Sequence, residues 1–97
     1  MHARVTKLQV EPAELDRAND YYRNTVLAGV RELEGFKGAV TLLDRQTGNV
    51  FSFTLWEDEE AMRASEEAGA RVRGQASSDL GFTPTVEHYE VGVFEAP

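Results

Sequence analysis

Residues 37–56, KGAVTLLDRQTGNVFSFTLW, decide the fold of this 97-residue chain. Residues 37–45 and 50–56 are rich in β-branched and aromatic side chains, which favours a strand in each. The four residues between them include Gly48 and Asn49. A loop of this kind predicts an antiparallel hairpin in which Gly48 has a positive φ angle. The rest of the fold is therefore predicted outward from a central hairpin.

A helix of about 20 residues is predicted before the hairpin. Pro12 suits the first turn because its φ angle is already fixed, and Gly35 suits the residue after the last turn. Between them, apolar residues recur at spacings of three and four, which indicates one buried stripe. The stripe comprises Leu15, Ala18, Tyr22, Val26, Val30 and Leu33.

A second helix is predicted to begin at the acidic run 57–60. Negative charge stabilises a helix N-terminus, and Asp58 suits the N-cap. A carboxylate metal site is the alternative, but consecutive helical residues diverge by about 100° and do not converge on one ion. Residues 77–81 are predicted to form a loop after this helix. One side of the predicted second helix carries mainly small side chains: Ala61, Ser65, Ala68, Val72 and Ala76.

Two further strands, residues 3–10 and 85–94, complete the order β-α-β-β-α-β. This order predicts an α+β, ferredoxin-like fold with a four-stranded antiparallel sheet and both helices on one face. The length fits a single domain over residues 1–97.

The predicted strands carry apolar side chains on both faces, although two helices can cover only one face. In the third strand Phe51, Phe53 and Leu55 oppose Val50 and Trp56. A homodimer packed sheet against sheet is the simplest cover for the second face. Binding of another protein is the alternative.

The composition excludes several classes of partner and site. Seventeen acidic and ten basic residues give a net charge of −7, which repels nucleic acids and anionic membranes. Without cysteine the chain forms no disulfide or thiolate metal site, and two histidines cannot build a three-histidine metal site. No apolar run approaches the roughly 20 residues that span a bilayer. The first residues carry no apolar leader, so a cytoplasmic protein is expected.

Two stretches resemble one known family. Gly35-Phe36-Lys37-Gly38 is similar to the Gly-Phe-x-Gly turn of the antibiotic-biosynthesis-monooxygenase-like family. Residues 53–62, FTLWEDEEAM, resemble its strand, tryptophan, acidic helix start and alanine. The resemblance implies a dimeric α/β barrel with a ligand pocket between sheet and helices in each subunit. The family includes cofactor-independent monooxygenases that act on phenolic polyketides, quinol oxidases and haem-degrading enzymes.

The haem-degrading branch matches this chain in part. Its tryptophan at the end of the third strand corresponds to Trp56, but the histidine nine or ten residues later corresponds to Ser65 or Glu66. The asparagine of its first strand corresponds to Thr6 or a position near it. Without an imidazole at those positions haem ligation is not expected, and no cofactor or metal is predicted.

The polyketide branch has an asparagine four residues before the tryptophan and a tyrosine six residues after it. This chain has Ser52 and Met62 there. A serine hydroxyl can still donate a hydrogen bond, whereas a methionine cannot act as an acid. Ser52 and Trp56 are therefore the candidate catalytic residues.

The predicted ligand site is built from one face of the third strand. Ser52, Thr54 and Trp56 point the same way because side chains alternate with period two. A tryptophan beside two hydroxyls suits an aromatic ligand. Tyr22 and Thr6 are the further candidates for substrate binding. The alternatives are structural: Trp56 could be a core residue whose N–H bonds a carbonyl, and Tyr22 could pack in the core.

Three further side chains have a functional and a structural interpretation. His88 could act as a general base near neutral pH, or it could be a structural residue of the last strand. Arg71 and Arg73 could steer an anionic ligand, or they could lie on a solvated helix face.

Two functions follow as hypotheses. One is a cofactor-independent monooxygenase acting on a small phenolic or polyketide-like aromatic, and the other is a non-catalytic module that binds a small ligand or assembles.

Overall fold

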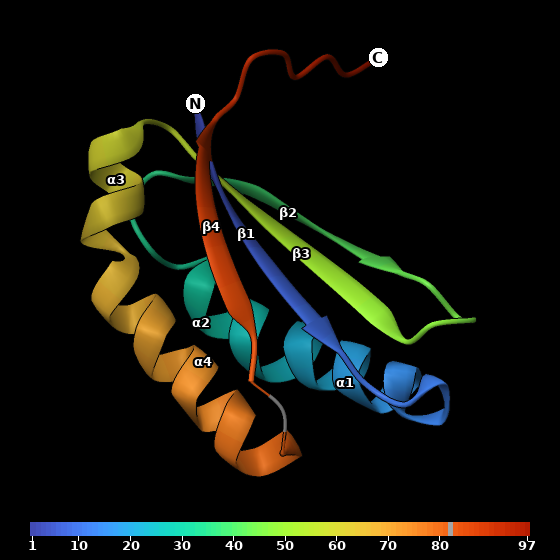
Figure 1. The fold of residues 1–97 in the computed structure, drawn as a ribbon. Coiled ribbons are helices and arrows are strands. Elements are labelled where there is room, and N and C mark those ends of the chain that lie inside the picture. Colours follow the sequence, from blue (N-terminus) through green and yellow to red (C-terminus); the bar gives the residue numbers. More distant parts are fainter. Residues whose placement is uncertain (82) are drawn as a thin grey trace.

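The fold, seen in a computed structural model that describes residues 1–81 and 83–97, is built on one antiparallel sheet. Its strands follow the order β2-β3-β1-β4, and the helices lie on one face (Figure 1). This confirms the predicted βαββαβ, ferredoxin-like arrangement. The strands are β1 (His2–Gln9), β2 (Phe36–Leu43), β3 (Asn49–Trp56) and β4 (Thr85–Glu90).

The hairpin between β2 and β3 forms as predicted. Gly48 has a φ angle of +81°, and its N–H donates to the carbonyl of Asp44 at 2.8 Å. The Gly48 carbonyl in turn accepts from the N–H of Val10 at 2.9 Å. The loop therefore also fixes the chain where it leaves β1.

The first helical segment differs from the single regular helix that its apolar stripe predicts. It ends at Val30, and Leu33 lies in the following turn, where it packs against the core. Gly35 has the predicted positive φ angle, +83°. The segment runs through a 3-10 turn η1 (Pro12–Glu14), α1 (Leu15–Tyr21), a π-helical turn η2 (Tyr22–Val26) and α2 (Leu27–Val30).

The second helical segment is divided into α3 (Glu59–Ala64) and α4 (Glu66–Leu80). Asp58 is the N-cap of α3, as predicted, and its carboxylate accepts from the N–H of Ala61 at 2.7 Å. The division falls at Ser65, whose hydroxyl donates to the carbonyl of Met62 at 2.6 Å. Such a bond from a serine to the preceding turn bends a helix.

Two predicted boundaries are wrong. The expected loop at residues 77–81 is helical as far as Leu80, because Gly81 adopts the left-handed conformation that ends a helix, with φ +77°. The last strand ends at Glu90 instead of residue 94. Its ladder stops where the N–H of Val91 donates to the carbonyl of Met1, beyond which β1 offers no further pairing.

The two faces of the sheet differ in cover. Along β3 the buried positions alternate with half-buried ones, and the buried set faces the helices. On the other face Val40, Leu42 and Tyr89 are about half exposed. The sheet therefore presents apolar side chains on a face that no helix covers (Figure 1).

Within the described residues, no helix combines the length and apolar character that crossing a membrane requires.

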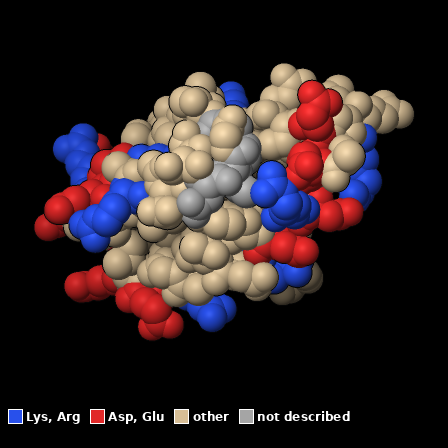
Figure 2. Space-filling view, turned by 90° about the horizontal axis from the view of Figure 1, so that it is seen from below, with Lys and Arg blue, Asp and Glu red and all other residues tan. Residues whose placement is uncertain are grey.

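The surface charge is mixed where Figure 2 displays it. Basic and acidic side chains stand next to one another at the margins of this view. Most basic side chains of the described residues are paired with a carboxylate, as in Arg63 with Glu59 and Lys7 with Glu87. This face therefore offers no continuous basic patch for a polyanion.

Candidate functional site

A cavity of about 80 Å³ lies between the sheet and the first helical segment. Thr6, Thr41 and Ser52 face it from three adjacent strands, since Ser52 is opposite both threonines in the sheet register. Tyr22 and Val26 close it from the π-helical turn. The exposed wall is mainly apolar, so the cavity suits a hydrocarbon ring with a few polar contacts.

The hydroxyl of Tyr22 is the notable polar group in this wall. It is buried and makes no hydrogen bond of ordinary geometry among the described residues, although the Ser52 hydroxyl lies close enough to interact with it. Burial raises the pKa of Tyr22, and the neighbouring Ser52 hydroxyl opposes this only in part. The phenol therefore stays protonated at neutral pH and can donate a hydrogen bond. A π-helical turn of this kind is frequent at functional sites, and Tyr22 is its first residue.

Trp56 and Thr54 lie outside this cavity. Trp56 is 0 % exposed, and its indole N–H donates to the Thr54 hydroxyl at 3.0 Å. Its ring packs edge-on against Phe36, with 5.6 Å between the ring centroids. Val30 and Met62 complete this core cluster. The structure thus places Trp56 in the core, with a side-chain hydroxyl as the partner of its N–H.

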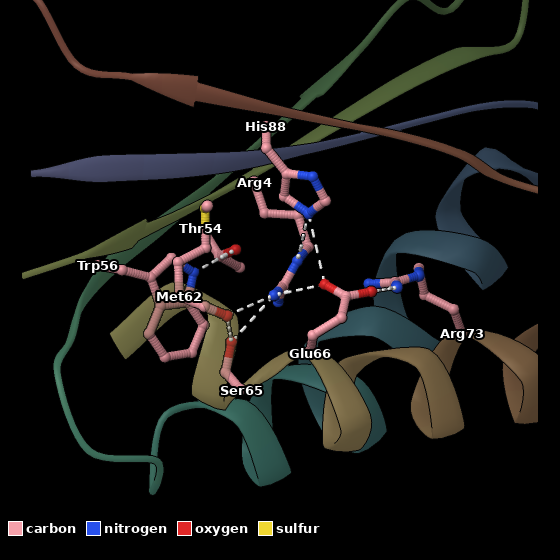
Figure 3. A network of polar contacts seen from close by, with 8 residues as sticks. All are labelled: Arg4, Thr54, Trp56, Met62, Ser65, Glu66, Arg73 and His88. Carbon is pink, nitrogen blue, oxygen red and sulfur yellow. Dashed lines mark hydrogen bonds and ion pairs between the residues drawn. The ribbon is translucent and has the colours of Figure 1, made fainter. Parts of the chain in front are cut away.

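Arg4 is a buried charged residue that no sequence motif predicts. It lies on the central strand β1, is 4 % exposed, and reaches the junction of α3 and α4 (Figure 3). Its guanidinium donates to the carbonyl of Met62 at 2.9 Å and to the Ser65 hydroxyl at 3.0 Å. The guanidinium carbon is 5.7 Å from the centroid of the Trp56 ring. The sequence feature that could have indicated this role is a charged residue on the helix-facing side of a central strand.

Glu66 joins Arg4 to two further side chains. Its carboxylate is 2.8 Å from the Arg4 guanidinium, 3.4 Å from the His88 imidazole and paired with Arg73 (Figure 3). Burial acts to raise the pKa of Glu66, but the hydrogen bond from Arg73 and the charge of Arg4 outweigh it and lower the pKa. Burial likewise lowers the pKa of Arg4, against the attraction of Glu66. His88 therefore belongs to this network and does not line the cavity.

Arg71 and Arg73 have different surroundings, although the sequence predicts the same two alternatives for both. The Arg71 side chain is 74 % exposed and pairs with Glu67. The Arg73 side chain is 18 % exposed and lines the cavity. A spacing of two along a helix turns side chains by about 200°. This rotation separates the two arginines.

The structure divides the predicted site residues into two groups. Thr6, Tyr22 and Ser52 line one cavity, whereas Thr54 and Trp56 form part of the core. No carboxylate or imidazole is among the cavity-lining residues that the structure describes. In the same described ranges, no three side chains of metal-binding type are placed to share an ion. The described lining can therefore donate hydrogen bonds but supplies no base, and at about 80 Å³ the cavity is smaller than one that holds benzene.

Comparison with known proteins identifies the family. Residues 1–76 match the family model described as antibiotic biosynthesis monooxygenase, abbreviated ABM. The chain belongs to the ABM family. Uncharacterized protein Rv2557 of Mycobacterium tuberculosis is 32 % identical to it over 91 residues, which is 94 % of this chain. The chain spans only 41 % of that protein.

Two solved structures share the ABM fold. A monooxygenase from the gene ActVA-Orf6 of Streptomyces coelicolor, in complex with nanaomycin D, superposes with a TM-score of 0.76 at 22 % identity, over 99 % of this chain and 92 % of that one. The heme-degrader MhuD of M. tuberculosis, with two hemes bound, superposes with a TM-score of 0.70 at 17 % identity, over 99 % and 100 %. At these identities the comparison shows the fold alone.

Proposed function

We propose that the chain is a cofactor-independent monooxygenase that acts on a small phenolic aromatic bound in the cavity under η2. The observation that carries this proposal is the mainly apolar cavity, with a Tyr22 hydroxyl that makes no hydrogen bond of ordinary geometry among the described residues and the Ser52 hydroxyl beside it. An unpartnered buried hydroxyl costs about 1–3 kcal/mol. A ligand oxygen that accepts from Tyr22 would recover this free energy.

The proposed reaction balances without an added reductant. One atom of O₂ bonds to a ring carbon of the phenol. The second atom leaves as water with the hydrogen of that carbon and the hydrogen of the phenol hydroxyl, and the product is a quinone. The chain contributes orientation and hydrogen bonds to the developing oxygen charge. Tyr22 and Ser52 are the donors in position to do this.

The size of the cavity sets a condition on binding. A cavity of about 150 Å³ holds benzene, whereas this one measures about 80 Å³. A phenol therefore enters only if one wall moves outward. Tyr22 and Val26 supply the helical wall from a π-helical turn.

Replacing Ser52 with alanine tests the catalytic role. With a monocyclic or bicyclic phenol and no flavin, metal or haem, the unmodified protein is expected to consume O₂. Ser52→Ala should lower kcat roughly ten- to a hundredfold, with a smaller change in affinity, if its hydroxyl acts mainly in the transition state. Thr54→Ser is the control, because it keeps a hydroxyl for Trp56 outside the cavity. An oxygen electrode measures both rates.

The alternative is a non-catalytic module that binds a small ligand or assembles. The lack of a protein base among the described cavity-lining residues favours it. Under this alternative, phenols bind and O₂ is not consumed with any of them. That result would contradict the monooxygenase proposal and leave the cavity as a binding site.

Haem does not fit the residues present. The positions that correspond to the family's haem-ligating histidine are Ser65 and Glu66, and both bind the Arg4 guanidinium. A hydroxyl and a carboxylate so engaged offer no neutral nitrogen for an axial bond to iron. The two histidines lie on strands, at His2 and His88. The similarity to MhuD therefore gives no haem chemistry to this chain.

A homodimer packed sheet against sheet is part of the proposal. The uncovered face carries Phe51, Phe53 and Val40, and an obligate interface of this kind buries roughly 2,000 Å² or more. Phe53→Asp should dissociate the dimer, because the carboxylate would be buried without a partner. Ala70→Asp, on the exposed side of α4, is the control. Light scattering that gives a 10.8 kDa particle for the unmodified protein would contradict the dimer.

A further inference from the structure

The π-helical turn η2 holds one residue more than an α-helical turn. The N–H of Leu27 donates to the carbonyl of Tyr22, which lies five residues back instead of four. Just before this turn, the N–H of Tyr22 is shared between the carbonyls of Ala18 and Asn19. The helical segment therefore changes its hydrogen-bond register at the point where it passes over the cavity.

The extra residue explains how four apolar side chains come to face the sheet. Ala18 and Val30 are buried, and Tyr22 and Val26 line the cavity. Neighbours in this series are four residues apart. Because an α-helix turns by about 100° per residue, such a spacing drifts by about 40° at each step, or roughly 120° over the series. The π turn takes up this drift, and it does so with one residue that a regular helix does not need.

The surroundings of η2 allow it to rearrange. Residues 23–25, on its outer side, are exposed. Gly29 of the following helix α2 is also exposed, and a Cβ atom there would meet no atom of the described residues within 4 Å beyond its own stretch of helix. On either side the segment is anchored: the Thr41 hydroxyl donates to Asn19 Oδ1 at 3.1 Å, and Val30 lies in the core. Movement is therefore confined to the residues between these anchors.

We propose that η2 is the wall that opens to admit an aromatic ring, by passing its extra residue on towards Gly29. This inference rests on the proposed function, because it takes a ring as the ligand of the cavity. With the extra residue beyond Val26, an α-helical register turns that side chain about 80° away from the direction of Ala18. Val26 then leaves the cavity wall, while Val30 keeps its place in the core.

The size of the cavity makes this rearrangement part of binding. At about 80 Å³ it is smaller than a cavity of about 150 Å³ that holds benzene. The sheet side cannot yield, because Thr6, Thr41 and Ser52 lie on three strands that are hydrogen-bonded to one another. A ring therefore binds only the rearranged form, and its apparent affinity is reduced by the fraction of protein in that form. The π turn thus determines which ring sizes the chain accepts.

Deletion of Asn24 tests the role of the extra residue. Ala18 and Val30 are then eleven residues apart instead of twelve, within about 20° of whole α-helical turns, so a regular helix keeps the same face on the sheet. The melting temperature should be unchanged or higher, but Val26 stays in the wall. The affinity for 2-naphthol, measured by calorimetric titration, should fall roughly tenfold or more. Asn24→Ala keeps the chain length and is the control, with an affinity within about twofold of that of the unmodified protein.

Val26→Ala provides a test of opposite sign. It removes the side chain that has to leave the wall, so 2-naphthol should bind roughly fivefold or more tightly than to the unmodified protein. Added to the Asn24 deletion, it should restore most of the lost affinity, whereas general damage to the cavity would not be repaired in this way. If the deletion variant does not fold, Val26→Ala and the unmodified protein decide the question, and equal affinities contradict the inference.

The outcomes separate this inference from the proposed reaction. It is overturned if 2-naphthol does not bind, if the deletion of Asn24 leaves its affinity intact, or if Val26→Ala brings no gain. Binding that depends on the π turn without O₂ uptake from any phenol supports the inference and contradicts the monooxygenase proposal. O₂ uptake that is equal in the deletion variant and the unmodified protein does the reverse.

Discussion

Trp56→Ala is expected to lower the free energy of unfolding by about 3–5 kcal/mol, as large-to-small changes at buried aromatic sites do. Trp56 is 0 % exposed and packs against Phe36, Val30 and Met62. Its loss also leaves Arg4 without the ring beside its guanidinium. The total stability of a domain of this size is about 5–15 kcal/mol. The variant should therefore lose a large part of its stability, and urea titration followed by circular dichroism would show a much lower midpoint.

A second substitution at Trp56 distinguishes a role in the core from a role in the ligand cavity. Trp56→Phe keeps most of the apolar volume, so it should fold and lose less stability than Trp56→Ala. Because Trp56 does not line the cavity, Trp56→Phe should bind a phenol with an affinity within about twofold of that of the unmodified protein. A large loss of ligand affinity with little loss of stability would contradict the core assignment.

Gly48→Ala is the second change with a large expected effect. Gly48 has φ +81°, and a Cβ atom there would lie 1.8 Å from the carbonyl oxygen of Val10. The Val10 backbone cannot move away from the added Cβ atom as a flexible side chain could. Strain in the left-handed region alone costs about 1–3 kcal/mol. Together with the clash, the loss should reach roughly 3 kcal/mol or more.

Gly74→Ala is the matched control for this prediction. Gly74 lies within α4, and a Cβ atom there would meet no atom of the described residues within 4 Å beyond its own stretch of helix. Alanine should stabilise the helix by roughly 0.5–1 kcal/mol, because glycine is a poor helix former. Thermal unfolding of both variants measures the pair. Equal midpoints would contradict the steric assignment at Gly48.

The parts of the fold that sequence predicts well are those fixed by local chemistry. Gly48 and Gly35 adopt the positive φ angles expected of them, and Asp58 caps α3 as its position before the acidic run indicates. Each of these signals is contained within a few residues. The order of elements then leaves few topologies, so the sheet order could be predicted as well.

The parts that could not be predicted depend on contacts between distant residues. Period two places Ser52 and Trp56 on one strand face, but it does not tell which helix each one meets. Ser52 lies opposite Thr6 in mid-sheet, whereas Trp56 lies opposite His2 at the sheet end, where α2 and α3 close the core. The charge cluster escaped prediction for the same reason, since Arg4 and Glu66 are 62 positions apart in sequence.

The Arg4 side chain also governs how the domain opens locally. From β1 it holds the last turn of α3 at Met62, the junction at Ser65 and the first turn of α4 at Glu66. Fraying of this helical region would strip a guanidinium of its acceptors while the sheet still buried it, which is unfavourable. The α3–α4 junction should therefore open together with β1 as one cooperative unit, and its amide protons should exchange at the slow rate of the central strand.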